Sequence, residues 1–447
     1  MIVILGGGPA GRLAAVRLAS AGREVTLIEK GGKKSGIGGQ CLHFGCMPVC
    51  ALNDAARFLQ AAGNFRDLGL TDSVPALDFP VLLREMGKIQ ATIASVLDKE
   101  TRDAGAEIVY GREGRFDGKQ VVLGDEPLDA EAVILATGSL PNIPDIPGIE
   151  GHGIFTPHTL PRMDRLPERL AIIGGGIMAA EFAYIFSRFG SRVTVLARSS
   201  FLRQLDPQLR KRALRELSGT DIREGTCVLS LDGDAGDLRL ALDTAGCAAT
   251  LDCDAVLLAA GLVPNSLMLD GVAKGDCGEV IVDERMRTNL PSVYAGGDVT
   301  GPPYLTPVAR QQGIVAAENI LGNPVKVDYS FIPQSLNLGY ELAFCPPCGP
   351  GDKSLTIPGP AGPGTFWSVP ASDTGLAKIF VAPDGSLTGM AAASPGAGLI
   401  AGYMALLMKR NISVHDFSDF IEVHPSTDGV YGLAKYASEL LKRRERK

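Results

Sequence analysis

The sequence has no apolar run long enough to cross a bilayer, no leader-like start, and no basic stretch outside its last residues. The longest apolar helix candidate, residues 398–408, is too short to span a membrane. The first apolar run, residues 2–5, predicts a strand that leads into a glycine turn, with no charged region before it. The only basic cluster is the tail 442–447, and the net charge is −7, which argues against a nucleic-acid partner. We therefore expect a cytoplasmic protein without a membrane or nucleic-acid partner.

Nine cysteines stand in a chain of 447 residues, which is too long for one core and predicts two or three domains. A structural disulfide framework is not expected in a long cytoplasmic chain. The cysteines therefore indicate redox chemistry, a metal site or buried thiols.

One segment occurs twice. Residues 2–30 recur, at a constant offset of 168 residues, in the segment that ends at Arg198. Each copy predicts a strand, a glycine-rich turn, a helix and a second strand. The aligned turn residues are Gly6, Gly8 and Gly11 in the first copy, and Gly174, Gly176 and Ala179 in the second. In such a unit the first glycine makes the turn, the second admits a pyrophosphate, and the third position packs helix on strand. Two copies with both flanking strands predict two bound dinucleotides.

The copies differ where the second strand ends. The first copy ends in Glu29, whose carboxylate can accept from a ribose hydroxyl. The second has Ala197 there, followed by Arg198, and an arginine without a carboxylate suits a 2′-phosphate. Arg203 is a candidate second clamp. We interpret the first site as binding FAD and the second as binding NADPH rather than NADH; the alternative for Arg198 is a solvated surface cation.

Cys41 and Cys46 follow the first copy within a glycine-framed segment, with four residues between them. A helix is predicted to begin near Cys46, and a helix N-terminus lowers the pKa of a thiol. The spacing lets the two sulfurs close a small ring, which predicts a redox-active disulfide beside a flavin. The alternatives are buried inert thiols, or metal ligands together with His43, although this spacing does not match a structural zinc site.

The segment 38–48 resembles the active-site segment of the pyridine nucleotide–disulfide oxidoreductases, flavoproteins that include dihydrolipoyl dehydrogenase, glutathione reductase and mercuric reductase. The resemblance covers essentially the whole chain. Four further segments match in the correct order: the crossover at Gly138, the return crossover at Gly261, the second flavin motif that ends at Asp298, and the segment around His424.

The resemblance implies a role for each of these residues. Cys41 would be the interchange thiol that attacks the substrate disulfide, and Cys46 the charge-transfer thiol against the flavin ring. His424 would be the base that keeps Cys41 as thiolate. Asp298 would hydrogen-bond the ribityl chain of FAD. In this family the histidine arrives from the other subunit, so the resemblance implies a homodimer.

The sequence departs from the family pattern at two of these sites. The family has a lysine where this chain has Cys50, although the glutamate that pairs with this lysine is present as Glu181. We interpret Cys50 as a small buried residue, with a third redox thiol as the alternative. The glutamate that orients the histidine should fall at Gly429, and Asp428 lies one residue short. Either Asp428 takes that role or His424 is less firmly held.

Cys345 and Cys348 flank two prolines at the end of a strand predicted over 336–344. Two cysteines at this spacing suit a second redox relay, which could pass electrons to a protein partner, or half of a metal site. No second cysteine pair supplies the other half of a zinc site. The remaining interpretation is a rigid loop with unused thiols.

The predicted fold class is α/β, with two doubly wound dinucleotide-binding domains and a C-terminal α+β dimerisation domain. The FAD-binding domain is predicted over 1–145 and 265–322, the NAD(P)H-binding domain over 146–264, and the interface domain over 323–447. In the last, strands are predicted over 336–344 and 377–381, and helices near 399–409 and 430–442.

The predicted function is an FAD-dependent NAD(P)H:disulfide (dithiol) oxidoreductase of the dihydrolipoyl dehydrogenase type, working in either direction. A small-molecule disulfide, a lipoyl group or a thioredoxin-like protein would each serve as substrate. The C-terminus lacks the extra cysteine pair of mercuric reductases. The alternative is a flavoprotein redox sensor, or an electron-transfer subunit that acts on a protein partner without disulfide turnover.

Overall fold

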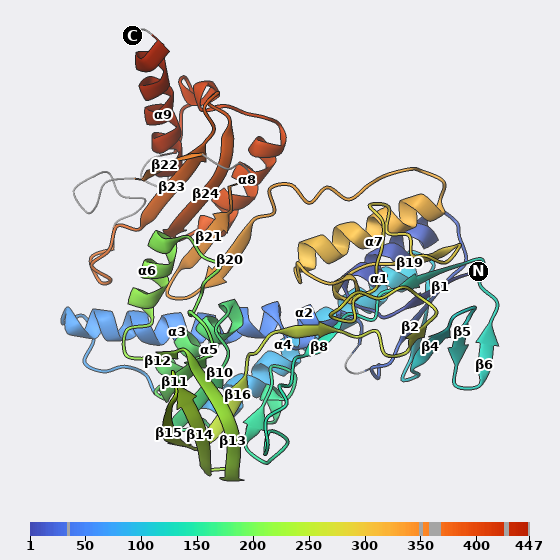
Figure 1. Cartoon of the computed structure of the whole chain (residues 1–447), viewed down its shortest axis with the longest axis horizontal. Helices are drawn as coiled ribbons and strands as arrows, with labels where there is room; N and C mark the ends of the chain where they lie inside the picture. Colours follow the sequence, from blue (N-terminus) through green and yellow to red (C-terminus); the bar gives the residue numbers. More distant parts are fainter. Residues whose placement is uncertain (34–35, 348–351, 357–367, 424–428, 446–447) are drawn as a thin grey trace.

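The computed structural model describes residues 1–33, 36–347, 352–356, 368–423 and 429–445. Three five-stranded sheets organise this part of the chain, and long helices run between them (Figure 1). Within the described residues no helix is both long and apolar enough to cross a membrane.

The first sheet is parallel and has the strand order β19-β7-β1-β2-β3. Its strands are β1 (Ile2–Leu5), β2 (Val25–Glu29), β3 (Glu107–Tyr110), β7 (Ala132–Leu135) and β19 (Val293–Ala295). The central strands are buried along their whole length, as expected for a parallel sheet with both faces covered. Helices α1 (Pro9–Ser20) and α7 (Thr306–Ile320) pack against each other beside it.

The second sheet repeats this arrangement, with the order β12-β11-β10-β16-β9 and every pair parallel. Its strands are β9 (Ile154–Phe155), β10 (Arg169–Ile173), β11 (Arg192–Ala197), β12 (Asp221–Glu224) and β16 (Ala255–Leu258). Strand β10 holds the central place that β1 holds in the first sheet, and α5 (Ile177–Phe189) follows β10 as α1 follows β1. The internal repeat is therefore structural, and the predicted α/β fold class is confirmed.

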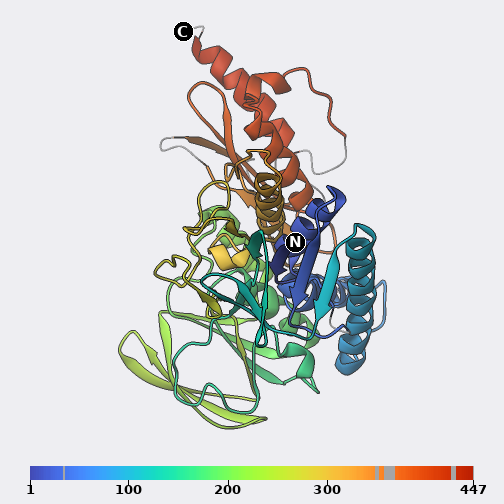
Figure 2. The same cartoon turned by 90° about the vertical axis from the view of Figure 1, so that its right-hand side faces the viewer.

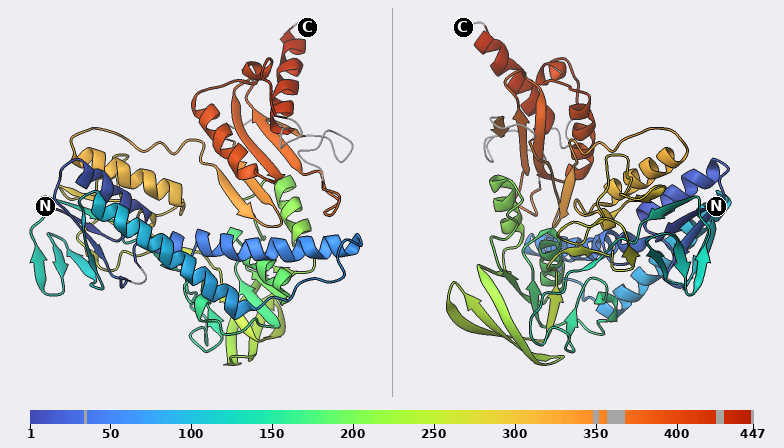
Figure 3. Two further views of the ribbon diagram at one scale, coloured as in Figure 1. Left: turned by 180° about the vertical axis from the view of Figure 1, so that it is seen from behind. Right: turned by 45° about the vertical axis from the view of Figure 1, so that its right-hand side comes forward.

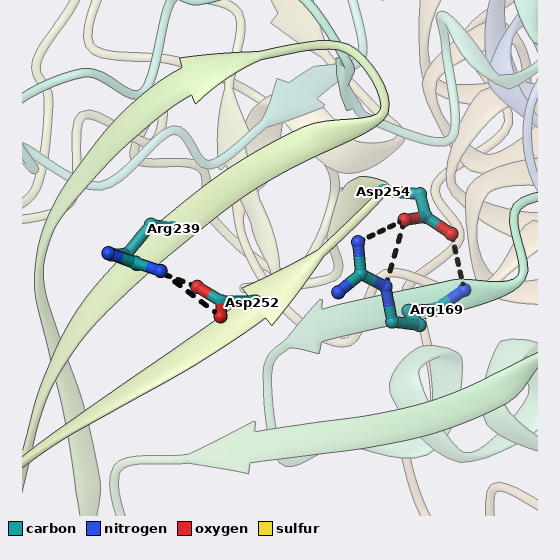
Figure 4. Close-up of polar contacts among 4 residues, drawn as sticks. All are labelled: Arg169, Arg239, Asp252 and Asp254. Carbon is teal, nitrogen blue, oxygen red and sulfur yellow. Dashed lines mark hydrogen bonds and ion pairs between the residues drawn. The ribbon is translucent and has the colours of Figure 1, made fainter.

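Each parallel sheet has a smaller companion sheet. The companions are β4 (Gly114–Asp117), β5 (Val121–Leu123), β6 (Glu126–Leu128) and β18 (Leu269–Asp270), and the meander of β13 (Thr226–Asp234), β14 (Asp237–Thr244) and β15 (Cys247–Cys253). The companion beside the first sheet is mixed, because β18 pairs parallel with β4, whereas the companion beside the second is antiparallel. Two ion pairs hold the meander (Figure 4). Arg239 of β14 pairs with Asp252 of β15. At its base, Arg169 donates to Asp254 from its backbone nitrogen and from its guanidinium, which joins the meander to the start of β10.

The third sheet is antiparallel, with the order β20-β21-β24-β23-β22. Its strands are β20 (Gln334–Asn337), β21 (Glu341–Cys345), β22 (Lys353–Thr356), β23 (Leu376–Val381) and β24 (Leu387–Ser394), and its helices are α8 (Ala397–Lys409) and α9 (Gly429–Glu445). The single strand predicted over 336–344 is wrong, because the chain turns at 338–340 and forms a hairpin. The other predicted strand and both predicted helices are present.

Two long helices, α3 (Cys46–Asp67) and α4 (Phe79–Asp103), run through the middle of the molecule between the sheets (Figures 1 and 3). In the view turned by 90°, α4 stands at the right-hand side (Figure 2). Helix α3 packs against α5, and so extends from the first sheet to the second. The two crossovers meet as well: β8 (Ser139–Pro141) pairs antiparallel with β17 (Leu262–Pro264). The domain boundaries given by the sequence stay a prediction.

Candidate active site

The two glycine turns have the same geometry. Gly6 has φ +104°, and a Cβ there would lie 2.1 Å from the carbonyl oxygen of Ala136. Gly174 has φ +149°, and a Cβ there would lie 2.2 Å from the carbonyl oxygen of Ala259. Each turn thus touches the end of the neighbouring parallel strand, and only glycine fits in either place.

The helices that follow these turns begin without a side-chain cap. Gly8 and Gly176 are the N-cap residues of α1 and α5, and neither can satisfy the first N–H groups of its helix. These N–H groups and the positive end of the helix dipole make an anion site at each turn. The two copies differ at the third aligned position of the turn. In the first copy, a Cβ on Gly11 would lie 2.0 Å from the carbonyl oxygen of Gly6, whereas in the second copy Ala179 is accommodated and fully buried.

Glu29 lies at the end of β2 and is held beside the first turn. Its carboxylate accepts from the backbone N–H of Gly7 at 2.9 Å and from that of Gly31 at 2.7 Å. These bonds leave lone pairs of the carboxylate available for a further donor, such as a hydroxyl.

The end of β11 carries no carboxylate. Ala197 is buried, whereas Arg198 and Arg203 are exposed, and neither forms an ion pair with a described residue. The loop between these arginines folds back on the second glycine turn, because the N–H of Leu202 donates to the Gly175 carbonyl at 2.7 Å. Two unpaired guanidinium groups therefore flank the loop that touches the turn.

A single cavity of about 550 Å³ joins the first glycine turn to both cysteines. Its walls include the turn, the end of β2, the crossover, the second flavin motif and the N-terminus of α7. Its lining residues include Gly6, Gly8, Glu29, Cys41, Cys46, Gly138, Asp298 and Thr306. The volume lies within the roughly 300–1,000 Å³ of typical ligand sites. Of the residues predicted to hold FAD, all but Gly11 thus line the same cavity as the predicted redox pair.

Cys41 and Cys46 are both free thiols in the structure. A hydrogen bond from Cys46 lowers the pKa of Cys41 to about 6, and the charge of Arg310 acts in the same direction. The same bond to Cys41, together with burial, raises the pKa of Cys46. The sequence predicted the lowered pKa for Cys46, which is wrong. Helix α3 does begin at Cys46, but the hydrogen bond between the two thiols couples their titration, and its effect on both pKa values favours the anion on Cys41.

Three residues that the sequence analysis missed complete the site. The hydroxyl of Thr306, in the first turn of α7, lies 3.9 Å from the sulfur of Cys46. Ser139, directly after Gly138, donates to Asp298 at 2.7 Å, and its hydroxyl also lies 3.2 Å from the side-chain oxygen of Gln40. Ser139 could have been identified from the sequence, because it is a polar residue directly after the crossover motif at Gly138. Thr306 has no such signal, because 260 residues separate it from Cys46.

Glu181 is a buried carboxyl of α5, 6% exposed. Its Oε1 accepts from the backbone N–H of Asn337 at 2.9 Å and from the side-chain amide of Asn337 at 3.2 Å. Burial raises the pKa of Glu181 to about 7, and the nearby Cys46 acts in the same direction. Cys50, which stands where the family has its lysine, is exposed on α3, so its interpretation as a buried residue is wrong. Its role as a third redox thiol stays a prediction.

Several predicted residues lie outside the part of the chain that the structure describes. His424, Asp428 and Cys348 are among them, so the base, its orienting carboxylate and the second relay stay predictions. Cys345 lies buried at the end of β21. At the crossovers, the carbonyl of Gly138 accepts from the N–H of Asn265 and the carbonyl of Gly261 from that of Asn142, both at 2.9 Å.

Comparisons with known proteins give a consistent result. Residues 1–313 match the family described as pyridine nucleotide-disulphide oxidoreductase. A dihydrolipoyl dehydrogenase of Chlamydia muridarum is 32% identical over 351 residues, 76% of this chain and 74% of that protein. A mercuric reductase of Streptomyces lividans is 33% identical over 353 residues, 74% of this chain and 72% of that protein. A mercuric reductase of Acidithiobacillus ferrooxidans is 29% identical over 464 residues, 97% and 81% of the two chains.

Solved structures show the same fold. The HOCl-induced flavoprotein disulfide reductase RclA from Escherichia coli matches with a TM-score of 0.83 at 24% identity, over 99% of both chains. At this identity the likeness is one of fold. The extent of the sequence match, together with the paired thiols beside a dinucleotide turn, settles the classification: this chain belongs to the pyridine nucleotide-disulphide oxidoreductase family.

Proposed function

We propose that this enzyme is an FAD-dependent NADPH:disulfide oxidoreductase that works through a Cys41–Cys46 redox disulfide. The observation that carries the proposal is the shared cavity, which the first glycine turn, Asp298 and both thiols line together. A thiol of lowered pKa within that cavity supports it, because thiolate is the form that attacks a disulfide.

The residues of the cavity suit FAD. The uncapped N-terminus of α1, at Gly8, would hold the pyrophosphate, and Glu29 would accept from the ribose of the adenosine. Asp298 keeps acceptor capacity beyond its bond from Ser139 and would hold the ribityl chain. When bound, FAD would take a hydride from the nicotinamide and supply two electrons to the disulfide.

The two thiols would perform the exchange with substrate. The Cys41 thiolate attacks one sulfur of the substrate disulfide, forms a mixed disulfide and releases the first product thiolate. Cys46 then loses its proton and attacks the Cys41 sulfur, which closes the Cys41–Cys46 disulfide and releases the second thiolate. The two products leave with the two electrons that the dithiol held. His424 is proposed to move the protons of these steps.

A second copy of the chain is proposed to complete the site. Helix α8 exposes Leu399, Tyr403 and Leu406, which follow one another at helical spacing and form an apolar stripe. A homodimer formed over this stripe would cover it, and the histidine of the partner subunit would then complete the site of each chain.

The experiment for the proposed function is steady-state oxidation of NADPH with a panel of disulfides: small-molecule disulfides, lipoamide and oxidised thioredoxin. Multiple turnovers with at least one of them are expected. A protein whose flavin NADPH reduces, but which turns over none of these disulfides, would instead be a sensor or an electron-transfer subunit.

The coenzyme is proposed to be NADPH, bound at its 2′-phosphate by Arg198 and Arg203. Replacing Arg198 by alanine is expected to lower kcat/KM for NADPH about ten- to a hundredfold, mainly through KM, because a charge-assisted bond to phosphate is lost. With NADH the variant and the unmutated enzyme should agree within about twofold. Equal use of the two coenzymes by the unmutated enzyme would refute the assignment.

A further inference from the structure

Arg310 lies on α7, the helix whose first turn lines the cavity. It follows Thr306 by four residues, so the two side chains project from the same side of the helix. Thr306 and Ala309 both line the cavity, and the Thr306 hydroxyl lies beside the sulfur of Cys46. Arg310 itself is exposed and does not line the cavity. Arg310 therefore stands one helical turn after Thr306, directly beside the part of α7 that lines the cavity.

The charge of Arg310 acts on the attacking thiol. Arg310 contributes to the lowering of the pKa of Cys41 and of the pKa of Arg12, so its positive charge acts on both groups. Arg12 is already paired with Glu100 of α4. No described carboxylate pairs with Arg310. A cation whose charge acts on the attacking thiol is thus without a carboxylate partner in the part of the chain that the structure describes.

We propose that Arg310 selects an anionic substrate, by binding a carboxylate that the substrate carries close to its disulfide. This inference rests on the proposed function and specifies the substrate class. The chain carries a net charge of −7, so an anionic molecule is repelled by the protein as a whole. A guanidinium one helical turn from Thr306, which lies beside the sulfur of Cys46, would offset that repulsion near the place where the substrate must react. A neutral lipoyl amide gains nothing from this arrangement, and a cationic disulfide is disfavoured by it.

The substrate class is tested with three small disulfides of similar size and different charge: 3,3′-dithiodipropionate, bis(2-hydroxyethyl) disulfide and cystamine. The expected order of kcat/KM is anionic, then neutral, then cationic. Arg310→Ala should lower kcat/KM for dithiodipropionate about tenfold, through KM, and change the neutral disulfide by less than about twofold. Arg310→Glu should reverse the order. Arg239→Ala removes the same charge from the distant meander (Figure 4) and should leave all three values unchanged.

The possible results separate this inference from the proposed function. Turnover of no disulfide at all would overturn both. Turnover that does not depend on substrate charge, or a loss in Arg310→Ala that is equal for the three disulfides, would overturn the inference alone.

A second measurement needs no turnover. In the reduced protein, Cys41 is alkylated with iodoacetate and, separately, with the neutral iodoacetamide, and the two rates are compared by peptide mapping. The ratio of the iodoacetate rate to the iodoacetamide rate should fall about three- to tenfold in Arg310→Ala, because the local cation is removed. A ratio that stays the same in Arg310→Ala and Arg310→Glu would show that Arg310 does not act on this thiol.

Discussion

Replacing Cys41 by serine is expected to abolish turnover of every disulfide substrate, by at least about a thousandfold in kcat. A serine hydroxyl is not ionised near neutral pH, whereas the pKa of Cys41 is lowered to about 6, so the variant loses the attacking anion. Cys46→Ser should still form one mixed disulfide with substrate and then stop, because no thiol remains to resolve it. The measurement is NADPH oxidation with the best acceptor, together with mass spectrometry of the trapped adduct.

The matched control is Cys277→Ser. Cys277 is exposed and does not line the cavity, so turnover should be unchanged. Substantial disulfide turnover by Cys41→Ser would show that another group attacks the substrate, and the role given to Cys41 would then be wrong.

Replacing Glu181 by glutamine is expected to remove a pH-dependent loss of stability. The pKa of Glu181 is about 7 in the folded protein, against an ordinary value of 4.5. Between these values the folded state holds a proton that the unfolded state releases, so stability falls as the pH rises from about 4.5 through 7. The full difference corresponds to about 3 kcal/mol. Glutamine keeps the acceptor for Asn337 and carries no charge, so thermal unfolding midpoints should agree at pH 5 and favour the variant at pH 8.

A second variant tests the same explanation by adding a cation near Glu181 instead of removing the carboxylate. Cys50→Lys restores the cation that the family has at this place, and an ammonium beside Glu181 would lower its pKa. The extra stability at pH 8 should therefore be seen in Cys50→Lys as well. The contrary result is a difference in thermal unfolding midpoint between Glu181→Gln and the unmutated protein that stays constant from pH 5 to pH 8. That result would show that Glu181 does not titrate in this range.

The parts of the site that lie close together in the sequence could be predicted from it. A glycine turn is specified by its own residues: a Cβ on Gly6 would clash with the next strand, and Glu29 reaches back to the same turn. The spacing of Cys41 and Cys46 likewise fixes that they meet at the start of a helix. These features depend on local geometry, and the sequence contains that geometry.

The contacts between distant elements could not be predicted in this way. Asn337 donates a hydrogen bond to Glu181, which lies 156 residues earlier in the chain, and no sequence feature of either segment indicates that they interact. The lowered pKa was expected for Cys46 from the helix dipole, whereas the pKa of Cys46 is raised, because a hydrogen bond between two sulfurs cannot be inferred from the sequence. The strand predicted over 336–344 is part of a hairpin, which was missed because the turn between β20 and β21 is only three residues long.

The most direct test of the account is a reductive titration of the purified flavoprotein with NADPH, followed by its visible spectrum. If Cys41 and Cys46 face the flavin as proposed, two electrons should yield a long-wavelength absorbance band when the proton shared by the pair lies on Cys41 and Cys46 faces the ring as thiolate, and Cys46→Ser should lack this band. Reduction that bleaches the flavin directly, with no such band and with the Cys46→Ser spectrum unchanged from that of the unmutated protein, would contradict the account.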